Sequence, residues 1–158
     1  MDFNDTAEEA KFRKEAFEWL KANADLKEGP KDGWRSASEE EGLEQVKVWQ
    51  NKLYESGWAC MHWPKEFGGR ESTPIERVIW GQEISKFKVP GGYLEIGQGM
   101  AGPVMMMYAT EEQKARHLPP MARGEEIWCQ LFSEPGAGSD LAGLKTKSVL
   151  EGDTWTIN

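Results

Sequence analysis

Cysteine and positive charge are scarce in this sequence, and each scarcity excludes a class of protein. The 158 residues contain 2 cysteines, Cys60 and Cys129. Two cannot build a disulfide framework, so we expect free thiols in a cytoplasmic protein. Lysines and arginines number 19 against 27 aspartates and glutamates, which gives a net charge of −8. Nucleic acid is therefore not an expected partner, because phosphate backbones require a basic surface.

Long apolar runs are also missing. None is long enough to cross a bilayer, and the opening residues MDFND do not resemble a signal peptide, so we expect neither a membrane span nor a leader. The sequence does contain 8 tryptophans and 6 phenylalanines, with 39% hydrophobic and 29% charged residues. This composition is globular, and the large rings are expected to form much of the core.

Four capping-box spacings, in which a Ser or Thr precedes a Glu or Gln by three residues, predict helix starts. They are Thr6 and Glu9, Ser38 and Glu41, Thr73 and Glu76, and Thr110 and Gln113. Apolar stripes at helical spacing follow the first three: Phe12, Ala16, Trp19 and Leu20; Leu43, Val46, Trp49 and Leu53; and Ile75, Val78, Ile79, Trp80, Ile84 and Phe87. Gly29-Pro30 marks the loop after the first helix. We expect the second helix to end at Gly57 and the fourth at Leu118-Pro119-Pro120.

Residues 91–108 have a different character. They contain a single charge, Glu95, together with five glycines and a run of three methionines, Met105 to Met107. We interpret this segment as a buried helix whose small residues leave one side open.

The pattern changes after Gly124. Residues 127–132 predict a buried strand that contains Cys129, and residues 144–150 and 154–157 predict two strands joined through Gly152-Asp153. The expected fold is mainly α, with a helical part followed by the first strands of an incomplete β domain. An evolved stand-alone module should not end on an unpaired strand, so we expect a fragment of a longer protein.

The stretch Ser133 to Asp140 is the strongest candidate for chemistry. Gly136 and Gly138 permit positive φ, so successive backbone N–H groups could converge on an anion. A Rossmann fingerprint needs a helix directly after the glycines, whereas the residues from Leu144 onward look extended. The loop therefore indicates a phosphate-bearing ligand, and the alternative interpretation is a tight glycine turn with a capping serine.

Residues 128–142, WCQLFSEPGAGSDLA, resemble the signature of the acyl-CoA dehydrogenase family. Three further stretches resemble the same family in the same order: WPKEFGG at 63–69, Gly102-Pro103 followed by YATEEQK at 108–114, and LPP at 118–120 followed by Gly124-Glu125. The resemblance implies an N-terminal all-helical domain at residues 1–125. Residues 126–158 would begin the middle β domain, which is cut short here.

The resemblance also implies site residues. The family binds FAD, and positions lining the flavin ring correspond to Gln130, Phe132 and Ser133, while Gly138 and Ser139 would approach the flavin phosphates. Ser139 would also lie near CoA, and the acyl-pocket positions correspond to Met100, Ala101 and Val104. Many relatives carry an aromatic residue where this chain has Gln130. No catalytic residue is expected, because the family's catalytic glutamate belongs to its C-terminal domain.

For the whole enzyme the resemblance implies an acyl-CoA substrate, an electron-accepting flavoprotein and a homodimer or homotetramer. Two alternatives stay open. One is an acyl-CoA oxidase or a related flavin oxidase or monooxygenase on the same scaffold, and the other is a non-catalytic truncated helical module.

Other chemical groupings favour ordinary structural roles. Cys60 and His62 lack a second ligand pair, so a metal site is not expected. Glu66 and Glu134 are expected to anchor turns and not to form a catalytic pair. Lys145 and Lys147 alternate on a predicted strand and share one face, which is either solvated or close to a phosphate of CoA.

Overall fold

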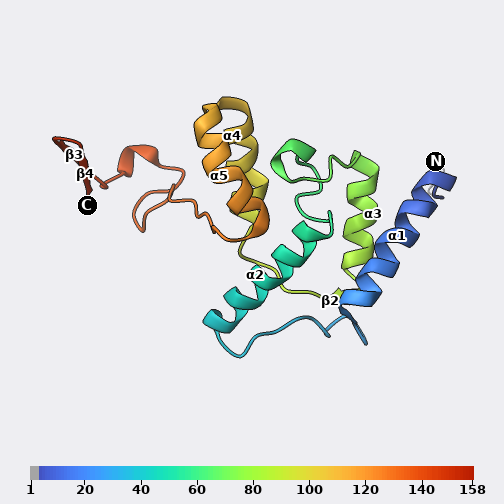
Figure 1. Cartoon of the computed structure of the whole chain (residues 1–158). Helices are drawn as coiled ribbons and strands as arrows, with labels where there is room; N and C mark the ends of the chain where they lie inside the picture. Colours follow the sequence, from blue (N-terminus) through green and yellow to red (C-terminus); the bar gives the residue numbers. More distant parts are fainter. Residues whose placement is uncertain (1–3) are drawn as a thin grey trace. The chain divides into compact units, whose positions relative to one another are not determined.

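The computed structural model describes residues 4–158, which form two units. The first ends at Trp128 and the second is Cys129–Asn158. The first unit contains the helices α1 to α5, and the second contains a β-hairpin (Figure 1). Among the described residues, no helix is both long enough and apolar enough to cross a membrane.

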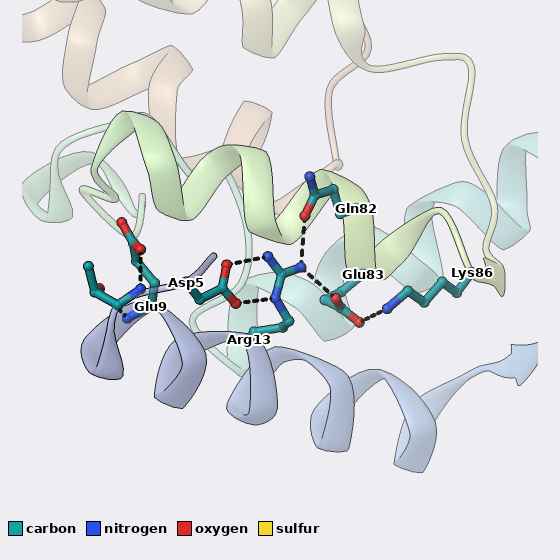
Figure 2. A network of polar contacts seen from close by, with 7 residues as sticks. Asp5, Glu9, Arg13, Gln82, Glu83 and Lys86 are labelled. Carbon is teal, nitrogen blue, oxygen red and sulfur yellow. Dashed lines mark hydrogen bonds and ion pairs between the residues drawn. The ribbon is translucent and has the colours of Figure 1, made fainter. Parts of the chain in front are cut away.

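Helices α1 (Ala7–Asn23) and α3 (Pro74–Ile84) begin with the predicted capping boxes. Thr6 and Glu9 satisfy each other's backbone N–H groups, and so do Thr73 and Glu76. The two helices pack against each other, and Arg13 of α1 reaches α3 through Glu83 at 2.8 Å and Gln82 at 2.7 Å (Figure 2). The capping signals therefore predicted both starts correctly.

Glu83 is a buried acid whose charge is compensated. Its carboxylate is 1% exposed and accepts hydrogen bonds from Arg13 and from Lys86 Nζ at 2.6 Å (Figure 2). Burial alone would raise the pKa of Glu83, but the hydrogen bonds from Lys86 and Arg13 outweigh it, so that the pKa lies below its ordinary value. Arg13 also binds both carboxylate oxygens of Asp5.

Helix α2 (Glu39–Glu55) begins with half of the expected capping box. Ser38 Oγ accepts from the N–H of Glu41, whereas the Glu41 carboxylate accepts from the N–H of Ala37 and not from that of Ser38. The helix ends as predicted, because Gly57 follows it with a φ of 72°.

Phe87 was expected at the end of the third helix, and this prediction was wrong. The helix stops at Ile84, and Phe87 lies in β2 (Phe87–Lys88), which pairs antiparallel with β1 (Asp25–Leu26). The side chain is 1% exposed. Its place in the apolar stripe therefore predicted its burial correctly but its secondary structure wrongly.

Tryptophan rings fill the centre of this unit. Trp58 and Trp80 stack with their ring centroids 4.7 Å apart, and Trp19 lies 6.0 Å from Trp58 and 5.7 Å from Trp49. Trp63, just before the 3-10 turn η1 (Lys65–Phe67), is completely buried. The expectation that aromatic rings build the core is confirmed.

Segment 91–108 is helical from Glu95 to Tyr108 and is not buried throughout. A π-helical turn η2 (Gly97–Ala101) leads directly into α4 (Gly102–Tyr108). Gly97 and Gly102 are buried, whereas Met107 and Tyr108 are exposed. The prediction of a buried helix fails because only the glycine side of the helix faces the rest of its unit.

Helix α5 (Glu111–Arg123) continues through the two prolines that were expected to end it. Each internal proline costs about 3 kcal/mol because it removes a donor and crowds the preceding turn. Burial of Leu118, Met121 and Ala122 compensates that cost. The helix ends instead at Gly124, whose φ is 77°.

The second unit is an irregular chain that ends in a hairpin. Strands β3 (Ser148–Glu151) and β4 (Thr154–Ile157) pair antiparallel through the predicted turn, where Gly152 has a φ of 62°. The first predicted strand of this pair was too long, because residues 144–147 are irregular and a 3-10 turn, η3 (Leu141–Gly143), precedes them.

The predicted buried strand at 127–132 is wrong. These residues have no regular structure, Cys129 is exposed, and Leu131 and Phe132 are 87% and 79% exposed. A strand requires a neighbour to satisfy its backbone, and no strand among residues 4–158 pairs with this segment.

Candidate functional site

The loop Ser133 to Asp140 folds into a tight turn. The N–H of Glu134 donates to the carbonyl of Ala137 at 2.9 Å, and the N–H of Ala137 donates back at 3.0 Å. Neither Gly136 nor Gly138 adopts a positive φ. The prediction of a nest of left-handed glycines was therefore wrong, because the turn closes through its own backbone bonds. The tight glycine turn that stood as the alternative describes the observed loop.

Glu134 fastens this turn to the residues before β3. Its carboxylate accepts from the backbone N–H of Lys145 at 2.6 Å and of Thr146 at 3.0 Å, and also from the Thr146 hydroxyl. These donors, led by the Thr146 hydroxyl, lower the pKa of Glu134. The residue anchors a turn, as expected. Glu66 lies exposed in η1 of the other unit.

The residues expected at the flavin lie around this turn and are all exposed: Gln130, Phe132, Ser133, Gly138 and Ser139. Ser133 and Gly138 are neighbours, since a Cβ on Gly138 would lie 4.0 Å from Ser133 Oγ. Within residues 4–158, neither the Ser133 nor the Ser139 hydroxyl has a hydrogen-bond partner. An apolar ring and two free hydroxyls beside a glycine turn fit a flavin nucleotide, although the backbone does not form a preset phosphate cradle.

The expected acyl-pocket residues lie on η2 and α4, in the first unit. Met100 and Val104 are 47% and 58% exposed and lie about one helical turn apart. Ala101 is partly buried and packs against the core. The structure therefore brings Met100 and Val104 together on one accessible apolar face and turns Ala101 away from it.

Trp63 shapes this helix, and sequence reasoning did not single it out. The indole Nε1 donates to the carbonyl of Gln98 at 2.8 Å. In the π-helical turn, the N–H of Gly102 donates to the carbonyl of Gly97, five residues earlier. In the same pattern the carbonyl of Gln98 would accept from residue 103, but Pro103 has no N–H to donate. Trp63 supplies the missing donor. The sequence signal for this contact was the Gly102-Pro103 pair. Proline has no N–H, so a backbone carbonyl in the helix is left without a donor, and glycine has no side chain, so an aromatic ring can approach the helix closely.

The Cys60 to His62 stretch offers no sign of metal chemistry. Cys60 is buried, and burial raises the pKa of its thiol to about 12, so the metal-binding thiolate is disfavoured. Over the part of the chain that the structure describes, no three side chains of His, Cys, Asp or Glu are grouped to hold a metal ion.

Comparison with known proteins agrees with this layout. Residues 6–125 match the family described as acyl-CoA dehydrogenase, N-terminal domain. Acyl-CoA dehydrogenase IpdE1 of Mycobacterium tuberculosis is 38% identical over 120 residues, which cover 76% of this chain and 31% of that protein. IpdE1 of Mycolicibacterium smegmatis is 37% identical over 164 aligned residues, covering 93% of this chain and 40% of that protein.

Solved structures show the same relationship. The Tcur3481-Tcur3483 steroid ACAD superimposes with a TM-score of 0.71 at 28% identity, over 99% of this chain and 39% of that one. The ChsE4-ChsE5 complex from Mycobacterium tuberculosis gives a TM-score of 0.68 at 28% identity, over 100% and 38%. The chain thus spans well under half the length of these relatives. The family match over residues 6–125 shows that it belongs to the acyl-CoA dehydrogenase family.

Proposed function

We propose that this chain is the N-terminal portion of a flavoenzyme that α,β-dehydrogenates acyl-CoA thioesters. The observation that carries the proposal is the family match over residues 6–125. We assign residues 1–125 to the helical domain and 126–158 to the start of the β domain, and we assign proton abstraction to a glutamate of the C-terminal part. Bound FAD would supply the acceptor for the β-hydride.

The residues proposed to hold FAD are Gln130, Phe132, Ser133, Gly138 and Ser139. The exposed ring of Phe132 offers an apolar surface to the flavin, and the free hydroxyl of Ser133 offers a donor to its polar edge. Gly138 and Ser139 would meet the flavin phosphates, with Ser139 also meeting CoA. Support comes from the accessibility of all five residues around one turn that Glu134 holds.

The residues proposed for the acyl surface are Met100 and Val104 on the exposed face of the helix, together with Ala101 on its core side. Methionine adapts to irregular ligands, and Gly99 beside it has nothing within 4 Å of the place where a Cβ would stand. We propose that this face accepts a bulky acyl group. The steroid ACAD among the similar structures supports that choice.

For the whole enzyme we propose a cytoplasmic oligomer, dimer or tetramer, that passes electrons to a flavoprotein acceptor. Assembly is supported by the ChsE4-ChsE5 complex among the similar structures.

The test begins with the visible spectrum and intact mass of the protein purified in its native length. A flavin band should be present and should bleach when an acyl-CoA is added without oxygen. Bulky thioesters should bleach it faster than short straight-chain ones. Absence of flavin after FAD is supplied, together with no bleaching, would contradict the proposal. Turnover confined to short straight chains would contradict only the assignment of a bulky acyl group.

Single substitutions sharpen this test. Ser133→Ala should weaken FAD binding about five- to tenfold, because one net hydrogen bond is worth about 1 kcal/mol. Ser148→Ala, an exposed serine on the hairpin, is the matched control and should leave FAD affinity unchanged.

A further inference from the structure

A solvent-open hollow of about 640 Å³ lies beside the glycine turn, entirely within the second unit. It is lined by Glu134, Pro135, Gly136, Lys145, Thr146, Lys147 and Asn158. The volume lies in the range of ordinary ligand sites, roughly 300–1,000 Å³. Reciprocal backbone hydrogen bonds of 2.9 Å between Lys147 and Asn158 fix one wall, and the Glu134 contacts to Lys145 and Thr146 fix another.

The charges around this hollow are unbalanced. The Glu134 carboxylate accepts three hydrogen bonds, two of them from backbone N–H groups, so its charge is already stabilised without a lysine. Within residues 4–158, the ammonium groups of Lys145 and Lys147 take part in no ion pair and no hydrogen bond. Two unpaired ammonium groups and one carboxylate therefore border the hollow, which leaves it with a net positive charge.

The basic residues of the second unit gather at this hollow, whereas most of its acidic residues do not. Lys145 and Lys147 are the two basic residues of the second unit, and both line the same hollow. The four acidic residues of this unit are Glu134, Asp140, Glu151 and Asp153, and only Glu134 lines the hollow. Although the chain has a net charge of −8, the electrostatic potential at this hollow is locally positive and favours the binding of anions.

We propose that Lys145 and Lys147 form a phosphate-binding site for a nucleotide phosphate. Two ammonium groups match a phosphate monoester or pyrophosphate, which carries more than one negative charge, better than a carboxylate, which carries one. The inference deepens the proposed function and rests on it. CoA and FAD are the two ligands there that carry such phosphates, and the shared chemistry is the phosphate itself.

The experiment titrates the whole chain with CoA, dephospho-CoA, FAD and inorganic phosphate, and follows backbone amide shifts of Gly136 and residues 145–147 by NMR. We expect these amides to respond to the phosphate ligands. Lys145→Gln with Lys147→Gln should weaken the responding ligand about tenfold, since each exposed charge pair contributes at most a few-fold. The same variant should reduce the salt dependence of binding.

Two matched variants control for charge and for folding. Lys11→Gln with Lys14→Gln removes the same charge from exposed lysines of the other unit and should leave affinity unchanged. Lys145→Arg with Lys147→Arg keeps the charge and should retain binding within about twofold. Retained hairpin shifts in each variant show that β3 and β4 still pair.

Comparison of the ligands shows which of the two phosphates, that of CoA or that of FAD, the site binds. Selective weakening of CoA relative to dephospho-CoA assigns the site to the terminal phosphate of CoA, whereas selective weakening of FAD assigns it to the flavin pyrophosphate. Equal affinity of the glutamine variant and the parent chain for every phosphate ligand would overturn the inference. So would loss of binding in the arginine variant. Either result leaves the flavin bleaching test untouched, so failure here is distinguishable from failure of the proposed function.

Discussion

The indole Nε1 of Trp63 and the carbonyl oxygen of Gln98 are 2.8 Å apart, although the two residues lie 35 positions apart in the chain. The bond closes the gap that Pro103 leaves in the π-helical turn, and the buried ring occupies the space beside Gly102. One side chain therefore both satisfies the irregular backbone and sets how closely η2 and α4 approach the core.

Trp63→Phe should destabilise the helical unit by roughly 3 kcal/mol. The change leaves the Gln98 carbonyl without its donor and opens a small cavity in a completely buried site. Urea unfolding followed by circular dichroism measures the loss. Trp34→Phe is the matched control, since its Nε1 bonds to the Gln45 side chain in a partly exposed position, and it should cost less than about 1 kcal/mol. Equal losses in the two variants would refute the role given to Trp63.

Gly102→Ala should destabilise by roughly 3 kcal/mol, because the new Cβ would lie 2.2 Å from a carbon of the Trp63 ring. Gly99→Ala, in the same helix, meets nothing within 4 Å and should stabilise by up to about 1 kcal/mol. If the contact is tight, thermal unfolding should show a lower melting temperature than the parent chain for Gly102→Ala and a higher one for Gly99→Ala. A neutral Gly102→Ala would show that the ring and the helix separate easily.

Arg13→Met should destabilise the α1–α3 pair by roughly 2 kcal/mol. The change removes the cation that faces buried Glu83, so that Lys86 alone compensates the carboxylate. Arg116→Met breaks the more exposed pair with Glu126 and should cost below about 1 kcal/mol. Urea midpoints at neutral pH provide the comparison.

The same ion pair predicts an acid dependence. The pKa of Glu83 in the folded protein lies below its ordinary value of 4.5. The stabilisation is therefore complete above about pH 4.5 and is lost as the pH falls through the lower folded pKa. The difference in urea midpoint between the parent chain and Arg13→Met should be constant at neutral pH and shrink on acidification below about 4.5. A difference that grows in acid would contradict this sign.

Glu134→Gln should loosen the glycine turn without unfolding the helices. An amide accepts through one oxygen where the carboxylate uses two, so the N–H groups of Lys145 and Thr146 cannot both keep their partner. Hydrogen exchange at these two amides should accelerate about tenfold or more, as expected for local opening. Glu151→Gln, an exposed acid on β3, should leave both amides unchanged.

Local signals were enough to predict most of the helical unit. Thr6, Thr73 and Thr110 cap their helices with the predicted partners, because capping depends on residues three positions apart. Gly57 ends α2 for the same local reason. Family membership was likewise visible in the sequence, because its motifs are contiguous stretches of chain.

Features that depend on distant partners were missed. Whether α5 stops at Pro119 is decided by burial of Leu118 and Met121, which no local rule records. Residues 127–132 are apolar enough for a strand, yet strand formation requires a neighbour that the described residues do not provide. The roles assigned to Ser133 and Ser139 at a flavin stay predictions.

The distribution of tryptophan between the two units decides what optical methods can see. Seven of the 8 tryptophans belong to the helical unit, where Trp58 and Trp80 stack at 4.7 Å with an interplanar angle of 14°. Trp155 is the single indole of the second unit, and it is already 60% exposed. Intrinsic fluorescence therefore follows the helices almost alone, so that the hairpin could open without a change in emission.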